Sequence, residues 1–149
     1  MTLRFHHACI ETADYAATID FYVRVLGFTV EQETPGFHGR AYNSWLRSGD
    51  IRLEVQTPKV GNESALAEVC PPADATLPVA APAAAATGLR HLCFVVDDLD
   101  AVLRRMETGG WARFAEKGGK RIYEVEGGRL LKVIAPEGTI IELREGEGI

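Results

Sequence analysis

Two histidines occupy matched places in the two halves of this sequence, and their side chains could bind a metal ion. His7 lies seven residues before Asp14, and His91 lies seven residues before Asp98. Each histidine stands in a short stretch rich in apolar residues, as a strand would require. Imidazole is a common ligand of divalent transition metals. The repeated histidine therefore indicates that each half of the chain could supply one metal ligand.

One glutamate closes each half in the same way. Glu54 lies in the segment 51–56 and Glu142 in the segment 139–144, and both segments alternate apolar with polar residues. Because strand side chains alternate between two faces, each glutamate lies opposite the apolar residues that a helix would cover. Two imidazoles and two carboxylates on the open faces of a twofold repeat suit divalent ions such as Ni, Co, Zn, Fe and Mn. We expect one such ion.

A helix and several strands must position these side chains in the first half. Asp14 can cap a helix that continues to about Leu26, and Gly27 can end it in the left-handed conformation. The expected strands of this half are 3–10, 28–33, 41–46 and 51–56. In chain order, the helix therefore falls between the strand of His7 and the other three strands of this half.

The second half repeats this order. Asp98 can cap a helix that continues to about Thr108 and ends at Gly109-Gly110. Gly127-Gly128 is a strong signal for a hairpin turn. The expected strands of this half are 89–96, 111–115, 122–126, 130–134 and 139–144.

Each half is thus a βαβββ module, and such a unit cannot bury its sheet face alone. We predict an α+β fold in which two modules share a core and form an open, cupped mixed sheet. The chain would be a single domain, 1–149, with modules over 1–57 and 88–149 and a linker over 58–87. Within 71–87, eight of 17 residues are alanine and four are proline, which disfavours a regular helix. The linker is either an extended spacer or a flap over a site.

Composition limits the class of protein. The 149 residues are 46 % hydrophobic and 25 % charged, which excludes a disordered chain, a collagen-like repeat and a coiled coil. A net charge of −5 argues against nucleic acid or an anionic membrane as the main partner. No apolar run reaches the ~20 residues of a membrane helix, and the first residues lack the apolar core of a signal peptide. With three cysteines that form no CxxC spacing, we expect a cytoplasmic protein.

In this arrangement the sequence resembles the vicinal oxygen chelate superfamily. That superfamily includes glyoxalase I, extradiol dioxygenases, methylmalonyl-CoA epimerase and fosfomycin or bleomycin resistance proteins. The resemblance is greatest to small glyoxalase-like (lactoylglutathione lyase-like) bacterial proteins. The residues that carry it are His7 with Asp14, Phe21-Tyr22 with Leu26-Gly27-Phe28, Glu54, Gly88-Leu89-Arg90-His91 with Val95-Val96-Asp97-Asp98, and Pro136-Glu137-Gly138 with Ile141-Glu142-Leu143.

The resemblance implies a set of metal ligands and a reaction. The ligands would be His7, Glu54, His91 and Glu142, and His6 is the rival of His7. The enzyme would be a metal-dependent lyase or isomerase that acts on a small α-oxo or hydroxy-carbonyl compound, or on its thiol adduct, through a metal-stabilised enediolate. A carboxylate of the set would move the proton, with Glu142 preferred over Glu54.

The same resemblance leaves two other functions open. One is an Fe(II) ring-cleaving dioxygenase, against which the fourth ligand Glu54 argues. The other is a non-catalytic protein that binds a drug or metabolite and confers resistance. Members of the superfamily are commonly dimers, so we expect a homodimer whose modules pair within one chain or between chains. In glyoxalase I an arginine near the first strand helps to hold glutathione, and Glu11 stands at the corresponding place here, so the thiol stays open.

A few other residues could line the site. Trp45 and Arg129 are the candidates for the substrate pocket, and Arg129 could pair with an anionic substrate. Cys9 and Cys93 each follow a candidate histidine by two residues. We expect them to be small apolar core residues, with thiolate ligation as the alternative.

Overall fold

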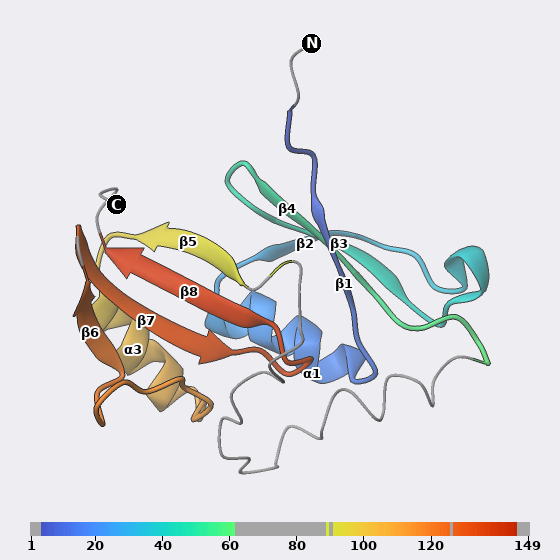
Figure 1. The fold of residues 1–149 in the computed structure, drawn as a ribbon. Coiled ribbons are helices and arrows are strands. Elements are labelled where there is room, and N and C mark those ends of the chain that lie inside the picture. Colours follow the sequence, from blue (N-terminus) through green and yellow to red (C-terminus); the bar gives the residue numbers. More distant parts are fainter. Residues whose placement is uncertain (1–3, 62–88, 90, 126, 146–149) are drawn as a thin grey trace. The chain divides into compact units, whose positions relative to one another are not determined.

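A computed structural model describes residues 4–61, 89, 91–125 and 127–145 of the chain (Figure 1). The chain divides into two compact units, unit 1 (Met1–Ala73) and unit 2 (Asp74–Ile149). Each unit contains one four-stranded sheet of mixed direction, which confirms the expected α+β class. No helix in the described ranges is long and apolar enough to cross a membrane. The linker expected at 58–87 lies outside the described residues from 62 onward, and the sharing of one core by two modules stays a prediction.

Unit 1 has the strand order β1-β4-β3-β2. Strand β1 runs parallel to β4, whereas β3 is antiparallel to both β4 and β2. The strands are β1 (Ala8–Glu11), β2 (Thr29–Glu33), β3 (Asn43–Ser48) and β4 (Ile51–Gln56), and a short 3-10 helix, η2, covers Phe37–Gly39.

The helix of unit 1 begins and ends where the sequence predicts. The Asp14 carboxylate accepts a hydrogen bond from the Ala17 backbone N–H at 3.1 Å, and Gly27 ends the helix with φ 82°. The sequence predicts a single α-helix here, and the second half of that prediction is wrong. The α-helix α1 (Tyr15–Asp20) continues as a π-helix, η1 (Phe21–Val25). The wider turn accommodates the neighbouring rings of Phe21 and Tyr22, both of which are fully buried.

Unit 2 repeats the arrangement with the strand order β5-β8-β7-β6. Strand β5 runs parallel to β8, and the other pairs are antiparallel. Asp98 caps the helix as expected, accepting a hydrogen bond from the Ala101 N–H at 2.8 Å. The elements are β5 (Leu92–Val96), α3 (Leu99–Thr108), β6 (Ile122–Val125), β7 (Gly128–Ile134) and β8 (Ile140–Glu145).

The strand expected at 111–115 is a wrong prediction. This segment forms only a single bridge, between Phe114 and Val133. Strand β6 already occupies the same edge of β7 from Gly128 to Leu131, so only a short length of that edge remains for residues 113–115. Strand β7 also begins earlier than expected, at Gly128. A Cβ atom at this position would lie 2.5 Å from the Glu145 carbonyl oxygen, so the sheet requires glycine here.

The helix of each unit covers one face of that unit's own sheet. In unit 1, α1 packs on β4, and in unit 2, α3 packs on β7 and β8. Each fully buried aliphatic side chain on these faces stabilises the fold by about 1.5–3 kcal/mol relative to an exposed one. Alternation along the strands then directs the remaining side chains to the other face, which carries the histidines and glutamates. The buried apolar residues include Ile10, Leu46, Leu53, Val55, Leu99, Met106, Leu131, Val133, Ile141 and Leu143.

Candidate metal and substrate site

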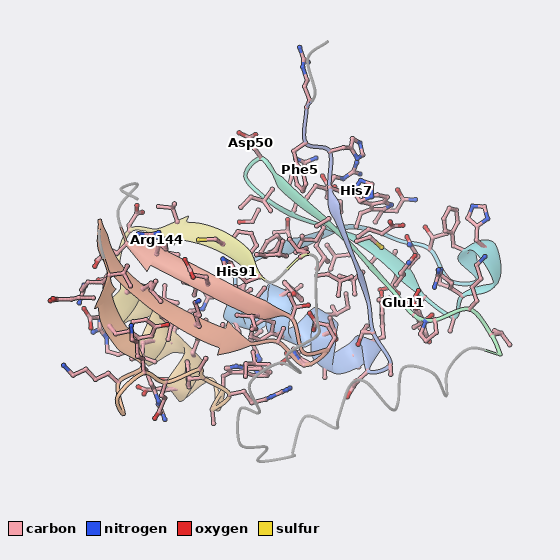
Figure 2. All side chains as sticks on the ribbon, in the orientation of Figure 1. Phe5, His7, Glu11, Asp50, His91 and Arg144 are labelled. Atoms are coloured by element: carbon pink, nitrogen blue, oxygen red, sulfur yellow. The ribbon has the colours of Figure 1, made fainter. Side chains whose placement is uncertain are left out.

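In unit 1 the structure brings His7 and Glu54 together. His7 immediately precedes β1 (Figure 2), and Glu54 lies on the neighbouring strand β4. His7 Nε2 is 3.6 Å from Glu54 Oε2, and the Glu54 side chain is 17 % exposed. This distance is too long for a hydrogen bond but shorter than twice a metal–ligand bond of ~2.1 Å. One ion could therefore contact both atoms.

Two neighbours hold this pair in place. The Asn43 amide donates a hydrogen bond to Glu54 Oε1 at 2.7 Å, which leaves Oε2 toward His7. Trp45 lies opposite Glu54 across β3 and β4, and its ring meets the His7 ring edge-on at 4.9 Å. The candidate pocket residue Trp45 is thus beside the candidate ligands. The rival histidine, His6, contacts His7 through the two Nδ1 atoms at 2.6 Å, so His7 is the one that meets the carboxylate.

Unit 2 repeats the pair with His91 and Glu142. His91 stands just before β5 (Figure 2), and Glu142 lies on the neighbouring strand β8. His91 Nε2 is 3.8 Å from Glu142 Oε2, and the Glu142 side chain is only 9 % exposed. The two units therefore place imidazole and carboxylate at nearly the same separation, as the sequence repeat predicts.

Glu142 has a partner that Glu54 does not share. Lys132 lies opposite Glu142 across β7 and β8, and its Nζ is 3.1 Å from Glu142 Oε2. Burial raises the pKa of Glu142, but the hydrogen bond and positive charge of Lys132 outweigh it, so the pKa lies below its usual value. The carboxylate is therefore charged at neutral pH, as a metal ligand must be. Lys132 is not among the residues predicted from the sequence, although its alternation with Leu131 and Val133 places it on the same face as the candidate ligand.

The two cysteines also lie beside the glutamates. Cys9 pairs with Glu54 across β1 and β4, and Cys93 with Glu142 across β5 and β8. Both residues are exposed, so the expectation of apolar core positions is wrong. Desolvation of the sulfur and the charge of Glu54 raise the pKa of the Cys9 thiol to about 11. Desolvation and Glu142 raise the pKa of Cys93 as well, and the Cys93 thiol donates a hydrogen bond to Glu142 Oε1 at 3.5 Å.

The metal donors occur as histidine–glutamate pairs. Within the parts of the chain that the structure describes, no three His, Cys, Asp or Glu side chains already gather as a metal-binding cluster. Nitrogen and oxygen donors in each pair are nevertheless the types that borderline divalent ions prefer. The residues present in each pair therefore fit such an ion.

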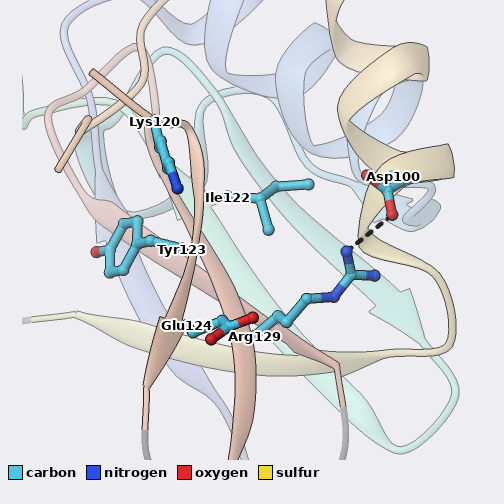
Figure 3. Close-up of a pocket in the computed structure, with 6 residues that line it drawn as sticks. All are labelled: Asp100, Lys120, Ile122, Tyr123, Glu124 and Arg129. Atoms are coloured by element: carbon cyan, nitrogen blue, oxygen red, sulfur yellow. Dashed lines mark hydrogen bonds and ion pairs between the residues drawn. The ribbon is translucent and has the colours of Figure 1, made fainter. Parts of the chain in front are cut away.

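Arg129 lies away from these pairs. Its guanidinium contacts Asp100 of α3 at 3.0 Å and Glu145 of β8 at 2.7 Å, so it lies on the helix-covered face of the sheet. There it lines a pocket of about 440 Å³ in unit 2 (Figure 3). The charges of this pocket are mixed, and Arg129 already has two carboxylate partners. The lining residues are Asp100, Lys120, Ile122, Tyr123, Glu124 and Arg129.

Comparison with known proteins identifies the family. Residues 6–129 match the family model described as Glyoxalase/Bleomycin resistance protein/Dioxygenase superfamily. The protein YaeR of Escherichia coli K12 is 35 % identical over 103 residues, which cover 69 % of this chain and 68 % of YaeR.

Solved structures agree on the fold. A glyoxalase family protein from Enterococcus faecalis is 26 % identical with a TM-score of 0.66, over 95 % of this chain and 97 % of that one. Lactoylglutathione lyase from Agrobacterium tumefaciens is 22 % identical with a TM-score of 0.61, over 98 % and 96 % of the two chains. The second similarity is one of fold alone.

Proposed function

The chain belongs to the glyoxalase/bleomycin resistance protein/dioxygenase superfamily, and on that basis we propose that it is a divalent-metal-dependent lyase or isomerase of the glyoxalase I type. Its substrate would be a small α-oxo or hydroxy-carbonyl compound, or the thiol adduct of one. The observation that carries the proposal is the repeated contact of imidazole and carboxylate, at 3.6 Å in unit 1 and 3.8 Å in unit 2.

The proposed ligands are His7, Glu54, His91 and Glu142, which would hold one Ni, Co, Zn, Fe or Mn ion. When bound, such an ion supplies the positive charge that stabilises an enediolate. The protein's part is to hold the two carboxylates in place before a metal ion binds. Asn43 orients Glu54 through a hydrogen bond, and Lys132 balances the charge of Glu142.

The proton transfer falls to one of the two glutamates. The sequence favours Glu142, but its ion pair with Lys132 lowers its affinity for a proton. The hydrogen-bond partner of Glu54 is the neutral amide of Asn43, which imposes no such charge. We therefore assign the proton-accepting role to Glu54 and the role of permanently charged ligand to Glu142.

Metal titration tests the ligand set. Metal-stripped wild-type protein is titrated calorimetrically with Ni²⁺, beside Glu54→Gln and His91→Ala, with Glu124→Gln as the matched control on β6. We expect one ion per chain, affinity lowered at least about tenfold in the two ligand variants, and no change in the control. Equal nickel affinity in all four proteins would remove the proposed set.

Turnover separates this proposal from the other two functions. We expect exchange of the proton next to the carbonyl when a methylglyoxal–thiol adduct is incubated in deuterated water, and loss of that exchange in Glu54→Gln. Oxygen uptake with catechols in the presence of Fe(II) would instead indicate a dioxygenase. Tight stoichiometric binding of a drug without turnover would indicate a sequestering protein. The homodimer is likewise a proposal, and sedimentation of the purified chain tests it.

A further inference from the structure

We propose that Lys132 selects the substrate, by binding a carboxylate group that lies next to the oxygens facing the metal. The substrate would then be a 2-oxo or 2-hydroxy carboxylate and not a neutral carbonyl compound. This inference rests on the proposed function, because it requires a metal ion on Glu142.

Lys132 occupies a place from which it can reach such a group. It lies at the centre of β7 on the face that carries Glu142, opposite that glutamate in the strand register. Its side chain is 29 % exposed and therefore partly open to solvent, whereas that of Glu142 is 9 % exposed. Leu130 and Arg144 form the next pair on the same face, so a second cationic residue lies two positions from Glu142 along β8.

The lysine is not a requirement of the fold. The corresponding position of unit 1, opposite Glu54, holds the neutral ring of Trp45. Glu54 is held by an amide, and its histidine contact is nearly the same as that of Glu142. The cation two positions along β4, Arg52, lies over the Trp45 ring at 4.3 Å, and a lysine directly opposite the glutamate occurs only in the second of the two described sheets.

Metal binding changes what this charge can do. While Glu142 is free of metal, its carboxylate is the anion that Lys132 contacts at 3.1 Å. A divalent ion on Glu142 draws that negative charge to itself and leaves the ammonium beside a second positive charge. An anion placed between the two relieves the repulsion. Lys132 Nζ lies 3.1 Å from an oxygen of the proposed ligand Glu142. A substrate anion that contacts this nitrogen must therefore be bonded close to the substrate oxygens that face the metal, as the carboxylate of a 2-oxo acid is.

An ammonium group suits this role. It is a compact point charge with three donors, and a carboxylate is its usual partner. A hydrogen bond to a charged group contributes about 1.5–3 kcal/mol, so its loss is expected to weaken binding about tenfold or more.

Two small chelators test the proposal on the nickel-loaded protein. Oxalate presents a carboxylate next to its chelating oxygens, and acetohydroxamate chelates without a carboxylate. Their dissociation constants are measured calorimetrically for wild type, Lys132→Met and Lys132→Arg. Lys120→Met, which removes a lysine from the distant pocket lining, is the control. We expect Lys132→Met to weaken oxalate about tenfold or more and acetohydroxamate less than about threefold. Lys132→Arg should restore oxalate, and the control should change neither.

Nickel titration of the metal-free variants provides a readout that does not depend on turnover. Lys132 competes with the ion for Glu142, so Lys132→Met should bind nickel at least as tightly as wild type. Unchanged oxalate affinity, equal weakening of both chelators, or loss of nickel from Lys132→Met alone would overturn the inference. Failure of wild type to bind nickel would refute the proposed function first, and the two failures are thus distinguishable.

Discussion

Lys132 and Glu142 face each other across β7 and β8 with their charged atoms 3.1 Å apart, where the first unit pairs Trp45 with Glu54. The same strand register thus produces a charged pair in one unit and an aromatic–carboxylate pair in the other. The two modules therefore place the same histidine–glutamate pair in different surroundings. This difference is the basis of the roles assigned above to Glu54 and Lys132.

Acid should weaken the fold partly through Glu142. Its folded-state pKa lies below the usual value, so its charged form stabilises the fold above the unfolded-state pKa. That contribution is lost as the pH falls through the folded-state pKa. We expect urea denaturation of Glu142→Gln to show a smaller loss of stability below pH 4.5 than wild type does. An identical pH profile in the two proteins would contradict the role of Lys132 in holding this charge.

Replacing Asn43 should affect metal binding more than an ordinary buried amide would. Asn43 is 1 % exposed and holds Glu54 through a 2.7 Å hydrogen bond. We expect Asn43→Ala to lower nickel affinity about 10- to 100-fold, since partners that orient a ligand have effects of this size. The free energy of unfolding should fall by about 1–3 kcal/mol. Calorimetric titration and urea denaturation measure the two effects, and unchanged nickel affinity in a folded variant would refute the orienting role.

The Cys9 thiol should react slowly despite its exposure. Its pKa of about 11 leaves little thiolate at neutral pH. In a variant with Cys70→Ser and Cys93→Ser, we expect the rate of reaction with a disulfide reagent to rise steeply from pH 9 to pH 11. Because the raised pKa favours the protonated folded state, stability should fall over the same interval. A rate that levels off near pH 9 would contradict the effect of Glu54 on this thiol.

Removing the helix cap of unit 2 should destabilise the fold by a measurable amount. The Asp98 carboxylate accepts a hydrogen bond from the Ala101 N–H at the start of α3. Asp98→Ala should therefore cost about 1 kcal/mol in the free energy of unfolding. Asp97→Ala is the matched control, because it removes an equal charge from an exposed neighbouring position outside the cap. Thermal denaturation compares them, and equal melting temperatures would contradict the capping role.

A methyl group at Gly128 should disturb the sheet itself. A Cβ there would lie 2.5 Å from the Glu145 carbonyl oxygen, and backbone cannot move aside as a flexible side chain can. Gly119→Ala is the control, because its backbone φ is also positive but the space around it is open. We expect Gly128→Ala to lower the free energy of unfolding by about 1–3 kcal/mol more than the control does. Similar losses of stability in the two variants would show that the positive φ, and not the contact with Glu145, determines the cost of the added methyl group.

Features that follow short-range rules are predictable from the amino-acid sequence. Helix starts at Asp14 and Asp98 are predictable because a cap needs only the next three residues. The shared face of each glutamate and its strand neighbours follows from a period of two residues. The family and fold class followed from the repeat of these local signals, which the structure and the comparisons confirm.

Which side chains meet across strands is known only from the folded chain. Lys132 reaches Glu142 because the β7–β8 register brings them opposite each other, and Arg129 turns to α3 because it alternates to the other face. The segment 111–115 fails as a strand because β6 already occupies most of the adjoining edge of β7. These outcomes depend on how the strands pair, and the pairing register is set by the turn between two strands together with the alternation within each one.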